Sequence, residues 1–383
     1  MRLSDIIKKA GADQQPPVGQ AEQQPIQPQC KQPSVEPQKP QQNNVFNSNS
    51  QAPKPAAPPP SKMSENISSA NNAYTNAINE TKTLISSMSK DDNASFTITC
   101  VEQLSNLIDN GNDDIIMLAD RATPDVYLYG HCVNVCIYSA MMAKGMGMDR
   151  DKLFRLAYAS YFHDMCLSKH LMLILRNGKL GPEEVNSVHS ISPQCIAMIE
   201  RNISHLPQVI KTSVLEVMSI MNEQKYGTKE RPATLSEESA EFAKLITITD
   251  IYEALTHPRP YRDRFLPHDA IKTMISTADN NFDSAMLKSF IEIISLYPLG
   301  SYVRLNTDEV ARVTGVNRGL PTRPKITIIT DSCGNRLPQH KLADLAASPM
   351  LFVKEAIDET KLKLADKKLM LELKAIRWWV KSL

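Results

Sequence analysis

The sequence predicts an all-α helical bundle over residues 63–297, with a disordered segment before it and a small β-rich extension after it. Three observations indicate this architecture. Apolar residues recur every three or four positions from Ser64 to about Ser295, which is the period of amphipathic helices. Proline and glutamine dominate the stretch before these residues. Short runs rich in β-branched residues follow them, beginning after the segment YPLG.

The segment before the helices lacks the composition of a folded domain. Residues 13–62 contain 12 of the 25 prolines and 12 glutamines, so they bury too little apolar surface to offset the entropy of ordering. We expect a disordered linker. Ahead of it, residues 1–12 place Leu3, Ile6 and Ile7 on one face of a short helix, which suits docking to a protein partner. A frayed terminus is an equal alternative, because isolated helices under about 12 residues are marginal in water.

Helices are expected in succession through the central part of the chain. Residues 63–120 should form leading helices, the first with Ile67, Tyr74, Ile78 and Leu84 along its apolar face. Polar or Gly/Pro-bearing turns separate the remaining predicted helices. These helices are expected at residues 98–109, 126–147, 151–163, 182–201, 207–223, 238–256 and 267–295.

The pattern changes after the helices. SYVRL, VARVTGV and KITIIT read as short strands, so residues 298–345 are predicted to form the β-rich extension. Residues 346–383 return to helix-forming composition and are predicted to be a C-terminal helix. Trp378 and Trp379 at its end are expected to pack on the chain's own core, with anchoring of a partner as the alternative. A homodimer formed through the long helices stays open.

Overall composition excludes several classes of function. Lysine and arginine number 43 against 42 aspartates and glutamates, so no net field attracts a nucleic acid polymer. The seven cysteines are odd in number, scattered and without a C-x-x-C pair, which argues against a disulfide framework or a zinc ribbon and fits a reducing cytoplasm. No run approaches the roughly 20 apolar residues that a membrane span needs.

Four polar residues stand where the surrounding sequence predicts burial. His131 and the pair His163 and Asp164 lie in or at the end of apolar helices, and Asp250 interrupts the run LITITDIYEAL. Buried imidazoles and carboxylates need partners, and a shared metal such as Fe, Mn, Zn or Ni would satisfy all four. Taken singly, a hydrogen-bonded core histidine and a helix-capping pair are the simpler interpretations.

A resemblance favours the metal. The order of these residues resembles the H…HD…D signature of the HD-domain phosphohydrolase superfamily. The surrounding blocks, above all ITITDIYEALTHPRPYRDRFLPHDAI, are similar to those of the HD-GYP family of cyclic di-GMP phosphodiesterases. The resemblance covers about residues 120–345 and implies an HD-GYP-like domain at residues 121–297. It implies phosphodiester hydrolysis by metal-bound water, with cyclic di-GMP or a related phosphate compound as substrate.

The resemblance also implies roles for particular residues. His131, His163, Asp164 and Asp250 would hold a divalent metal such as Fe or Mn, with Asp164 also catalytic. His189 matches a ligand of a second metal. Arg259 and Arg262 would bind substrate phosphates, the alternative being a surface turn with solvated arginines.

The chain departs from the family on the side of the second metal and the substrate. Leu167 stands where the family has a phosphate-binding lysine, Met221 and Asn222 stand where it has paired histidines, and no Gly-Tyr-Pro follows them. Tyr127 replaces a glutamate that some members use as a ligand. One metal site is therefore expected and the second is doubtful.

Two hypotheses follow from the matches and the departures. The first is a metal-dependent phosphodiesterase, weakened by loss of the second metal. The alternative is a catalytically degenerate signalling or scaffold protein that responds to a cyclic dinucleotide. We favour the first, because Asp164 and Asp250 would be costly buried charges in a protein that no longer binds metal.

Overall fold

The computed structural model describes most of the chain beyond residue 61. The described residues are 62–90, 97–119, 127–176, 181–189, 193–226, 235–259, 262–278, 282–359, 361–364 and 366–375. The predicted docking peptide at residues 1–12, nearly all of the predicted linker at residues 13–62, and Trp378 and Trp379 lie outside them.

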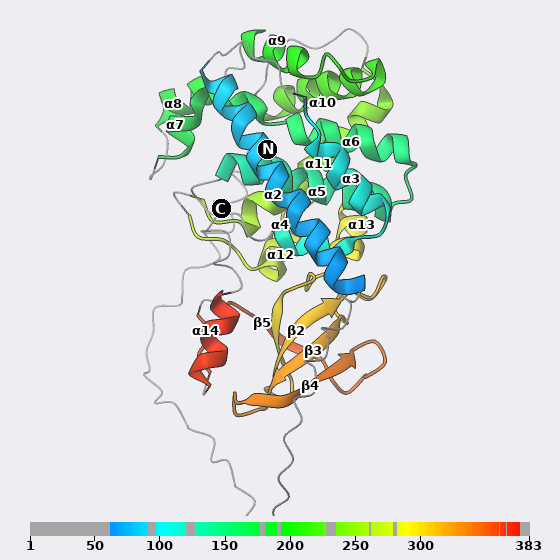
Figure 1. Ribbon diagram of the computed structural model, residues 1–383, viewed down its shortest axis with the longest axis vertical. Helices are drawn as coiled ribbons and strands as arrows, with labels where there is room; N and C mark the ends of the chain where they lie inside the picture. The colour runs from blue at the N-terminus through cyan, green and yellow to red at the C-terminus, as the bar shows by residue number, and fades with distance from the viewer. Residues whose placement is uncertain are drawn as a thin grey trace, which may run out of the picture.

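The described residues form a helical domain followed by a sheet domain (Figure 1). The leading part of the helical domain comprises α2 (Lys62–Ser89), α3 (Cys100–Asp109), the 3-10 helix η1 (Asp113–Ile115) and α4 (Ile116–Ala119). Its central part comprises α5 (Tyr127–Gly145), α6 (Arg150–Phe162), the 3-10 helix η3 (Met165–His170), α7 (Leu171–Ile174), α8 (Pro182–His189), α9 (Pro193–Asn202) and α10 (Gln208–Tyr226). It ends with α11 (Glu237–Thr256), α12 (Pro267–Ser276) and α13 (Ser284–Ile294).

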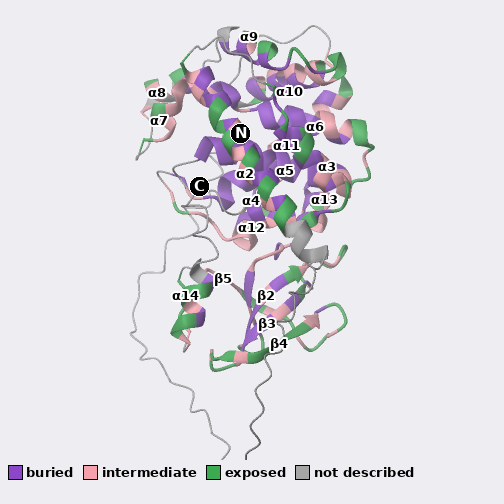
Figure 2. Cartoon of the chain, viewed as in Figure 1, coloured by how far each residue is buried: buried purple, intermediate pink, exposed green. Residues whose placement is uncertain are grey.

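Helices α5 and α11 form the centre of the helical domain. Every residue of α5 from Tyr127 to Ala143 is buried, and so is every residue of α11 from Ile248 to Thr256. Figure 2 shows this buried centre with exposed residues at the periphery. A helix that is buried on all sides must be apolar all round, except where its polar groups find partners inside the protein. The histidine of α5 and the carboxylates of α11 are such exceptions.

The sheet has five antiparallel strands in the order β4-β3-β2-β1-β5. Its strands are β1 (Tyr302–Leu305), β2 (Val310–Gly315), β3 (Lys325–Thr330), β4 (Arg336–Asp344) and β5 (Val353–Ile357). Successive residues point to opposite faces, so Val303 packs in one apolar cluster and Tyr302 in another. Helix α14 (Lys367–Ala375) covers the second face with Leu369 and Leu373.

The fold confirms the predicted class and corrects four details. Residues 353–357 form strand β5, paired with β1, so the prediction of helix from residue 346 onward is wrong there. The segment 267–295 forms two helices, because the side chain of Asp283 accepts hydrogen bonds from the amides of Ala285 and Met286 and starts α13 afresh. The segment 182–201 likewise carries two helices, α8 and α9.

The fourth correction concerns the cysteines. Cys166 and Cys195 form a disulfide between η3 and α9, with their Cα atoms 5.7 Å apart. The odd number and scattered positions of the cysteines had argued against a disulfide framework. The spacing along the chain carries no sign of this contact, because folding brings η3 and α9 together across 29 residues.

The helical domain and the sheet meet through charged and apolar contacts. Arg264, between α11 and α12, lies with its Nη2 atom 3.1 Å from Oε1 of Glu359, just beyond β5. A small pocket of about 60 Å³ lies at this junction, and Met117, Tyr297 and Arg312 are among its lining residues. Within the described residues, no helix combines the length and apolar character that crossing a membrane requires.

Candidate metal centre

Three separate parts of the helical domain bring four side chains to one point. His131 lies on α5 and Asp250 on α11. His163 is the C-cap residue of α6, and Asp164 is the N-cap residue of η3 with a backbone φ of −116°. Adjacent residues of a continuous α-helix point about 100° apart. The change from α-helix to 3-10 helix at Asp164 is what allows two consecutive side chains to face the same centre.

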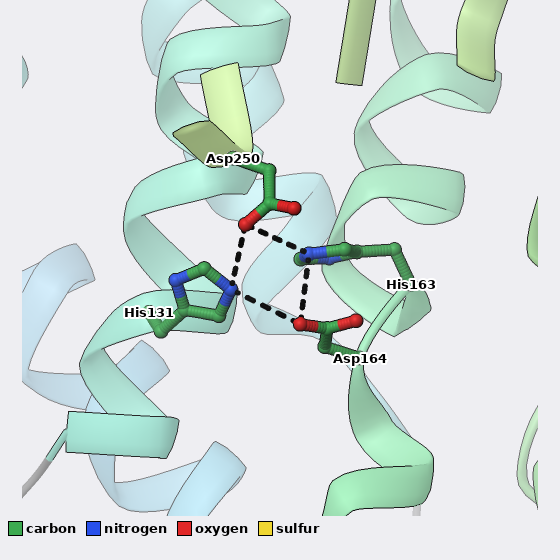
Figure 3. A group of neighbouring side chains, drawn as sticks. All are labelled: His131, His163, Asp164 and Asp250. Carbon is green, nitrogen blue, oxygen red and sulfur yellow. Dashed lines mark ion pairs between the residues drawn. The ribbon is translucent and has the colours of Figure 1, made fainter. Parts of the chain in front are cut away.

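The potential ligand atoms lie close together. The Nε2 atom of His131 is 3.5 Å from Oδ2 of Asp164 and 3.4 Å from Oδ1 of Asp250. The Nε2 atom of His163 is 3.6 Å and 3.9 Å from the same two oxygens. Figure 3 shows both imidazoles and both carboxylates directed at a common central point. All four ligand atoms lie within 4.8 Å of one another.

The hydrogen bonds of the imidazoles leave both Nε2 atoms for a ligand. His131 donates from Nδ1 to Oε2 of Glu253 at 2.6 Å, and His163 donates from Nδ1 to the carbonyl oxygen of Ser160 at 2.6 Å. Both Nε2 atoms are buried and make no hydrogen bond among the described residues. A neutral imidazole that donates from one nitrogen offers a lone pair on the other. These buried, unsatisfied atoms are what a metal would satisfy.

Charge within the centre is balanced by neighbouring groups. Burial opposes a charge on His131, but Glu253, Asp164 and Asp250 outweigh it and raise the pKa of His131 to about 9. Burial likewise disfavours an ionised Glu253, yet His257, His131 and Arg259 hold its pKa at about 2. At neutral pH both nitrogens of His131 are therefore protonated, and an incoming metal ion must displace the proton on Nε2.

Sequence reasoning missed the residues that support His131. Glu253, Asn134 and His257 surround its Nδ1 side, and all three are buried. The Nε2 atom of His257 donates to the carbonyl oxygen of Ala119, and its Nδ1 atom lies 3.3 Å from Oε1 of Glu253. The sequence did contain one indication of this support, which is Glu253 itself. It lies three residues after Asp250 in the same apolar run, and a buried carboxylate there needs a partner as much as Asp250 does.

Arg259 is buried beside Tyr127 and Glu253, which both contact His131. Its guanidinium lies 4.4 Å from the centre of the Tyr127 ring and donates to the Tyr127 hydroxyl. Its Nη2 atom is 3.9 Å from Oε2 of Glu253. Tyr127, at the position of a family metal ligand, thus holds an arginine, and phosphate binding by Arg259 stays a prediction.

Arg262 closes the end of α11. Its guanidinium donates to the carbonyl oxygens of Ala254, Leu255 and Asp263. Carbonyls in the last turn of a helix have no partner within the helix, so this arginine satisfies them and favours the helix dipole. The contacts give Arg262 a capping role, and its predicted role in phosphate binding also stays a prediction.

The residues predicted for a second metal are only partly described. His189 ends α8, but its side chain lies outside the described residues. Met221 and Asn222 are buried on α10. Leu167, at the position of the family lysine, is half-buried and packs against the helical core. The second metal site therefore stays a prediction.

The cysteines beside His131 belong to the core. Burial raises the pKa of the Cys132 thiol well above its usual range, and nearby carboxylates add to the effect. Burial also raises the pKa of the Cys136 thiol to about 12. Neither contributes to the group of metal-ligating side chains. Both are therefore small buried residues of the core.

We expect Cys132 and Cys136 to resist alkylation in the native protein. Only the thiolate reacts, and at pH 8 burial suppresses both its formation and its access to reagent. Mass spectrometry after a short exposure to iodoacetamide should find both unmodified, and modified once the protein is unfolded in guanidinium. Rapid labelling of either cysteine in the native protein would contradict the buried environment described for α5.

Comparison with known proteins agrees with these features. Residues 102–286 match the HD domain, and residues 302–365 match the KOW domain associated with HD domain. Over 216 residues, 56% of this chain and 50% of the relative, the chain is 24% identical to the cyclic di-GMP phosphodiesterase PA4108 of Pseudomonas aeruginosa. Over 199 residues, 52% of this chain and 51% of the relative, it is 24% identical to the cyclic di-GMP phosphodiesterase PdeB of Borreliella burgdorferi.

A third relative is a cyclic di-GMP phosphodiesterase of Vibrio cholerae. It is 27% identical over 126 residues, which are 32% of this chain and 25% of the relative. The chain thus spans about half the length of the first two relatives and less of the third. No solved structure matches the chain. The HD-domain match, these relatives and the converging His and Asp side chains show that the chain contains an HD domain and support its similarity to the HD-GYP-like phosphohydrolases.

Proposed function

We propose that this protein is a metal-dependent phosphodiesterase that hydrolyses cyclic di-GMP. The observation that carries the proposal is the convergence of two imidazole nitrogens and two carboxylates on one point, with both nitrogens buried and unsatisfied. The three relatives named as cyclic di-GMP phosphodiesterases support the choice of substrate. The alternative of a degenerate signalling protein has no comparable observation in its favour.

The four residues fit a divalent transition metal. Two nitrogen and two oxygen donors suit Fe, Mn or Zn better than calcium, which takes six to eight oxygens. Four protein ligands leave positions open on a metal that accepts five or six. We propose Fe or Mn in one site, and a second metal, if one binds, would be held through His189.

The chemistry divides between the metal and the chain. A bound divalent metal would lower the pKa of a water and polarise a phosphoryl oxygen. The carboxylates of Asp164 and Asp250 are 12% and 10% exposed, whereas the two imidazoles are almost completely buried. Substrate therefore reaches the centre from the carboxylate side. We assign Asp164 the catalytic role, because it is the most exposed of the four and would orient the reacting water by accepting its hydrogen bond.

The arginines of the following loop are the proposed phosphate contacts. Arg259 and Arg262 are tied together by two backbone hydrogen bonds, of 2.9 and 3.0 Å, so they move as a unit. Each guanidinium contacts the chain itself, so binding a phosphate would exchange those contacts for bonds to the substrate. Guanidinium groups favour such exchange because their bonds to phosphate are charge-assisted and can be bidentate.

Product chromatography tests the proposed function. Purified full-length protein loaded with Mn²⁺ or Fe²⁺ is incubated with cyclic di-GMP, and we expect linear dinucleotide or GMP to form. Asp164→Ala should reduce the rate by at least about 100-fold, because loss of even an outer partner of a ligand costs about 10–100-fold. Asp151→Ala is the matched control, since Asp151 is an exposed residue in the first turn of α6. Bound metal without turnover would instead indicate a receptor or scaffold.

A further inference from the structure

The carboxylate of Glu253 lies directly behind the metal ligand His131. Its Oε2 atom accepts the Nδ1 proton of His131 at 2.6 Å, and the Glu253 side chain is 1% exposed. We propose that Glu253 is a positioning residue that holds His131 with its Nε2 atom toward the metal. This inference rests on the proposed function only in requiring that the four-residue centre binds a metal.

The spacing of residues on two helices creates this arrangement. On α11, Asp250 and Glu253 are three residues apart and share a face, so one carboxylate faces Nε2 of His131 while the other reaches Nδ1. His131 is thus held between two carboxylates of the same helix. The Nδ1–H···O bond fixes both the tautomer and the tilt of the ring, which a histidine ligand requires.

Asn134 holds Glu253 in turn. Its Nδ2 donates to Oε1 of Glu253 at 3.2 Å, one helical turn beyond His131 on α5. The two oxygens of Glu253 therefore accept from two different donors. A carboxylate meets this requirement because both of its oxygens are acceptors, whereas an amide has only one acceptor and one donor group.

The leading helix α2 completes the chain of contacts. The hydroxyl of Tyr74 donates to Oδ1 of Asn134 at 3.0 Å, and both groups are buried. This bond determines which end of the Asn134 amide faces Glu253. Tyr74 precedes the part of the chain that matches the HD domain, which begins at residue 102. A helix outside the family match therefore reaches the metal centre through Asn134, Glu253 and His131.

The test measures binding of Mn²⁺ to the full-length protein by electron paramagnetic resonance, without substrate. We expect Glu253→Gln to weaken Mn²⁺ binding by about 10- to 100-fold. The introduced glutamine has one acceptor oxygen, which can accept from either His131 or Asn134 but not from both. Its NH₂ group then faces the N–H donor of the other residue. Circular dichroism establishes that the variant retains its helices.

A compensating change separates positioning from general stability. In the double variant Glu253→Gln with Asn134→Asp, the new carboxylate accepts from both Tyr74 and the introduced glutamine, whose amide oxygen then turns back to His131. We expect this double variant to bind Mn²⁺ at least about tenfold more tightly than Glu253→Gln does. Where Glu253→Gln alone does not fold, Tyr74→Phe serves instead, and we expect it to weaken Mn²⁺ binding by about threefold.

The outcomes distinguish this inference from the proposed function. Wild-type affinity in Glu253→Gln, or in Tyr74→Phe where that variant is used, would overturn the positioning role and leave the phosphodiesterase intact. A loss that Asn134→Asp fails to restore would make Glu253 merely structural and overturn the inference. If the wild type binds Mn²⁺ without hydrolysing cyclic di-GMP, the proposed function is refuted. If Glu253→Gln also weakens Mn²⁺ binding and Asn134→Asp restores it, the inference is still supported. A wild type that binds no Mn²⁺ overturns both.

Discussion

Saturating Mn²⁺ should raise the thermal unfolding midpoint of the wild-type protein by about 5–10 °C and leave that of Asp250→Ala unchanged. A ligand that binds only the folded state at about 100 times its Kd stabilises it by about 2.7 kcal/mol. In a domain of this size each 1 kcal/mol shifts the midpoint by about 2–4 °C. Asp250 provides one of the two carboxylates at the centre, with Oδ1 3.4 Å from Nε2 of His131. Without it, three ligands remain and the metal's charge is less well balanced.

Differential scanning calorimetry checks this result at several Mn²⁺ concentrations. The wild-type midpoint should rise with concentration and return to its starting value after treatment with EDTA. Asp151→Ala should behave as the wild type does, because its side chain is exposed and distant in sequence from every predicted ligand. Equal stabilisation of Asp250→Ala and the wild type would place the metal elsewhere in the protein.

Arg264→Ala should destabilise the protein by about 3 kcal/mol by leaving a buried carboxylate without its cation. Arg264 lies 3.1 Å from Glu359 and 3.5 Å from Asp358, and Glu359 is only 3% exposed. These contacts join the segment between α11 and α12 to the end of β5. The loss should therefore weaken the junction between the helical domain and the sheet in particular.

Urea unfolding followed by circular dichroism measures this loss. The double variant Arg264→Ala with Glu359→Gln should lose less stability than Arg264→Ala alone, since the unpaired charge is removed together with its partner. As a comparison, removing the exposed pair of Lys354 and Asp308, at 2.8 Å, should cost under about 1 kcal/mol. An Arg264→Ala variant as stable as the wild type would show that solvent reaches Glu359 and compensates it.

The positions of most helices and strands could be predicted from the local pattern of apolar residues. Helix α5 was expected at residues 126–147 and spans Tyr127–Gly145, and α11 was expected at residues 238–256 and spans Glu237–Thr256. Both are long and bounded by polar turns, so their period is unambiguous. Strand β5 was missed because VKEAI, with one isolated charged pair and no turn signal, fits a helix as well as an edge strand. Its pairing with β1 made it a strand.

The metal candidates were predictable for a chemical reason. Carboxylates and imidazoles in runs predicted to be buried need compensation, and the order of His131, His163, Asp164 and Asp250 matched a known signature. The same reasoning stopped short of Glu253 and His257. Their role depends on which nitrogen of His131 faces which helix, and that is set by the packing of α5 against α11.

Local sequence was thus sufficient for the helical class, for the change to strands after residue 297 and for the residue types of the metal centre. These features depend on neighbours within a few positions, where periodicity and the cost of burying a polar group act. Only the tertiary structure established the disulfide between Cys166 and Cys195, the stacking of Arg259 on the Tyr127 ring and the hydrogen bond between Tyr74 and Asn134. Each joins residues far apart in the chain, and such contacts depend on how whole helices pack rather than on any local pattern.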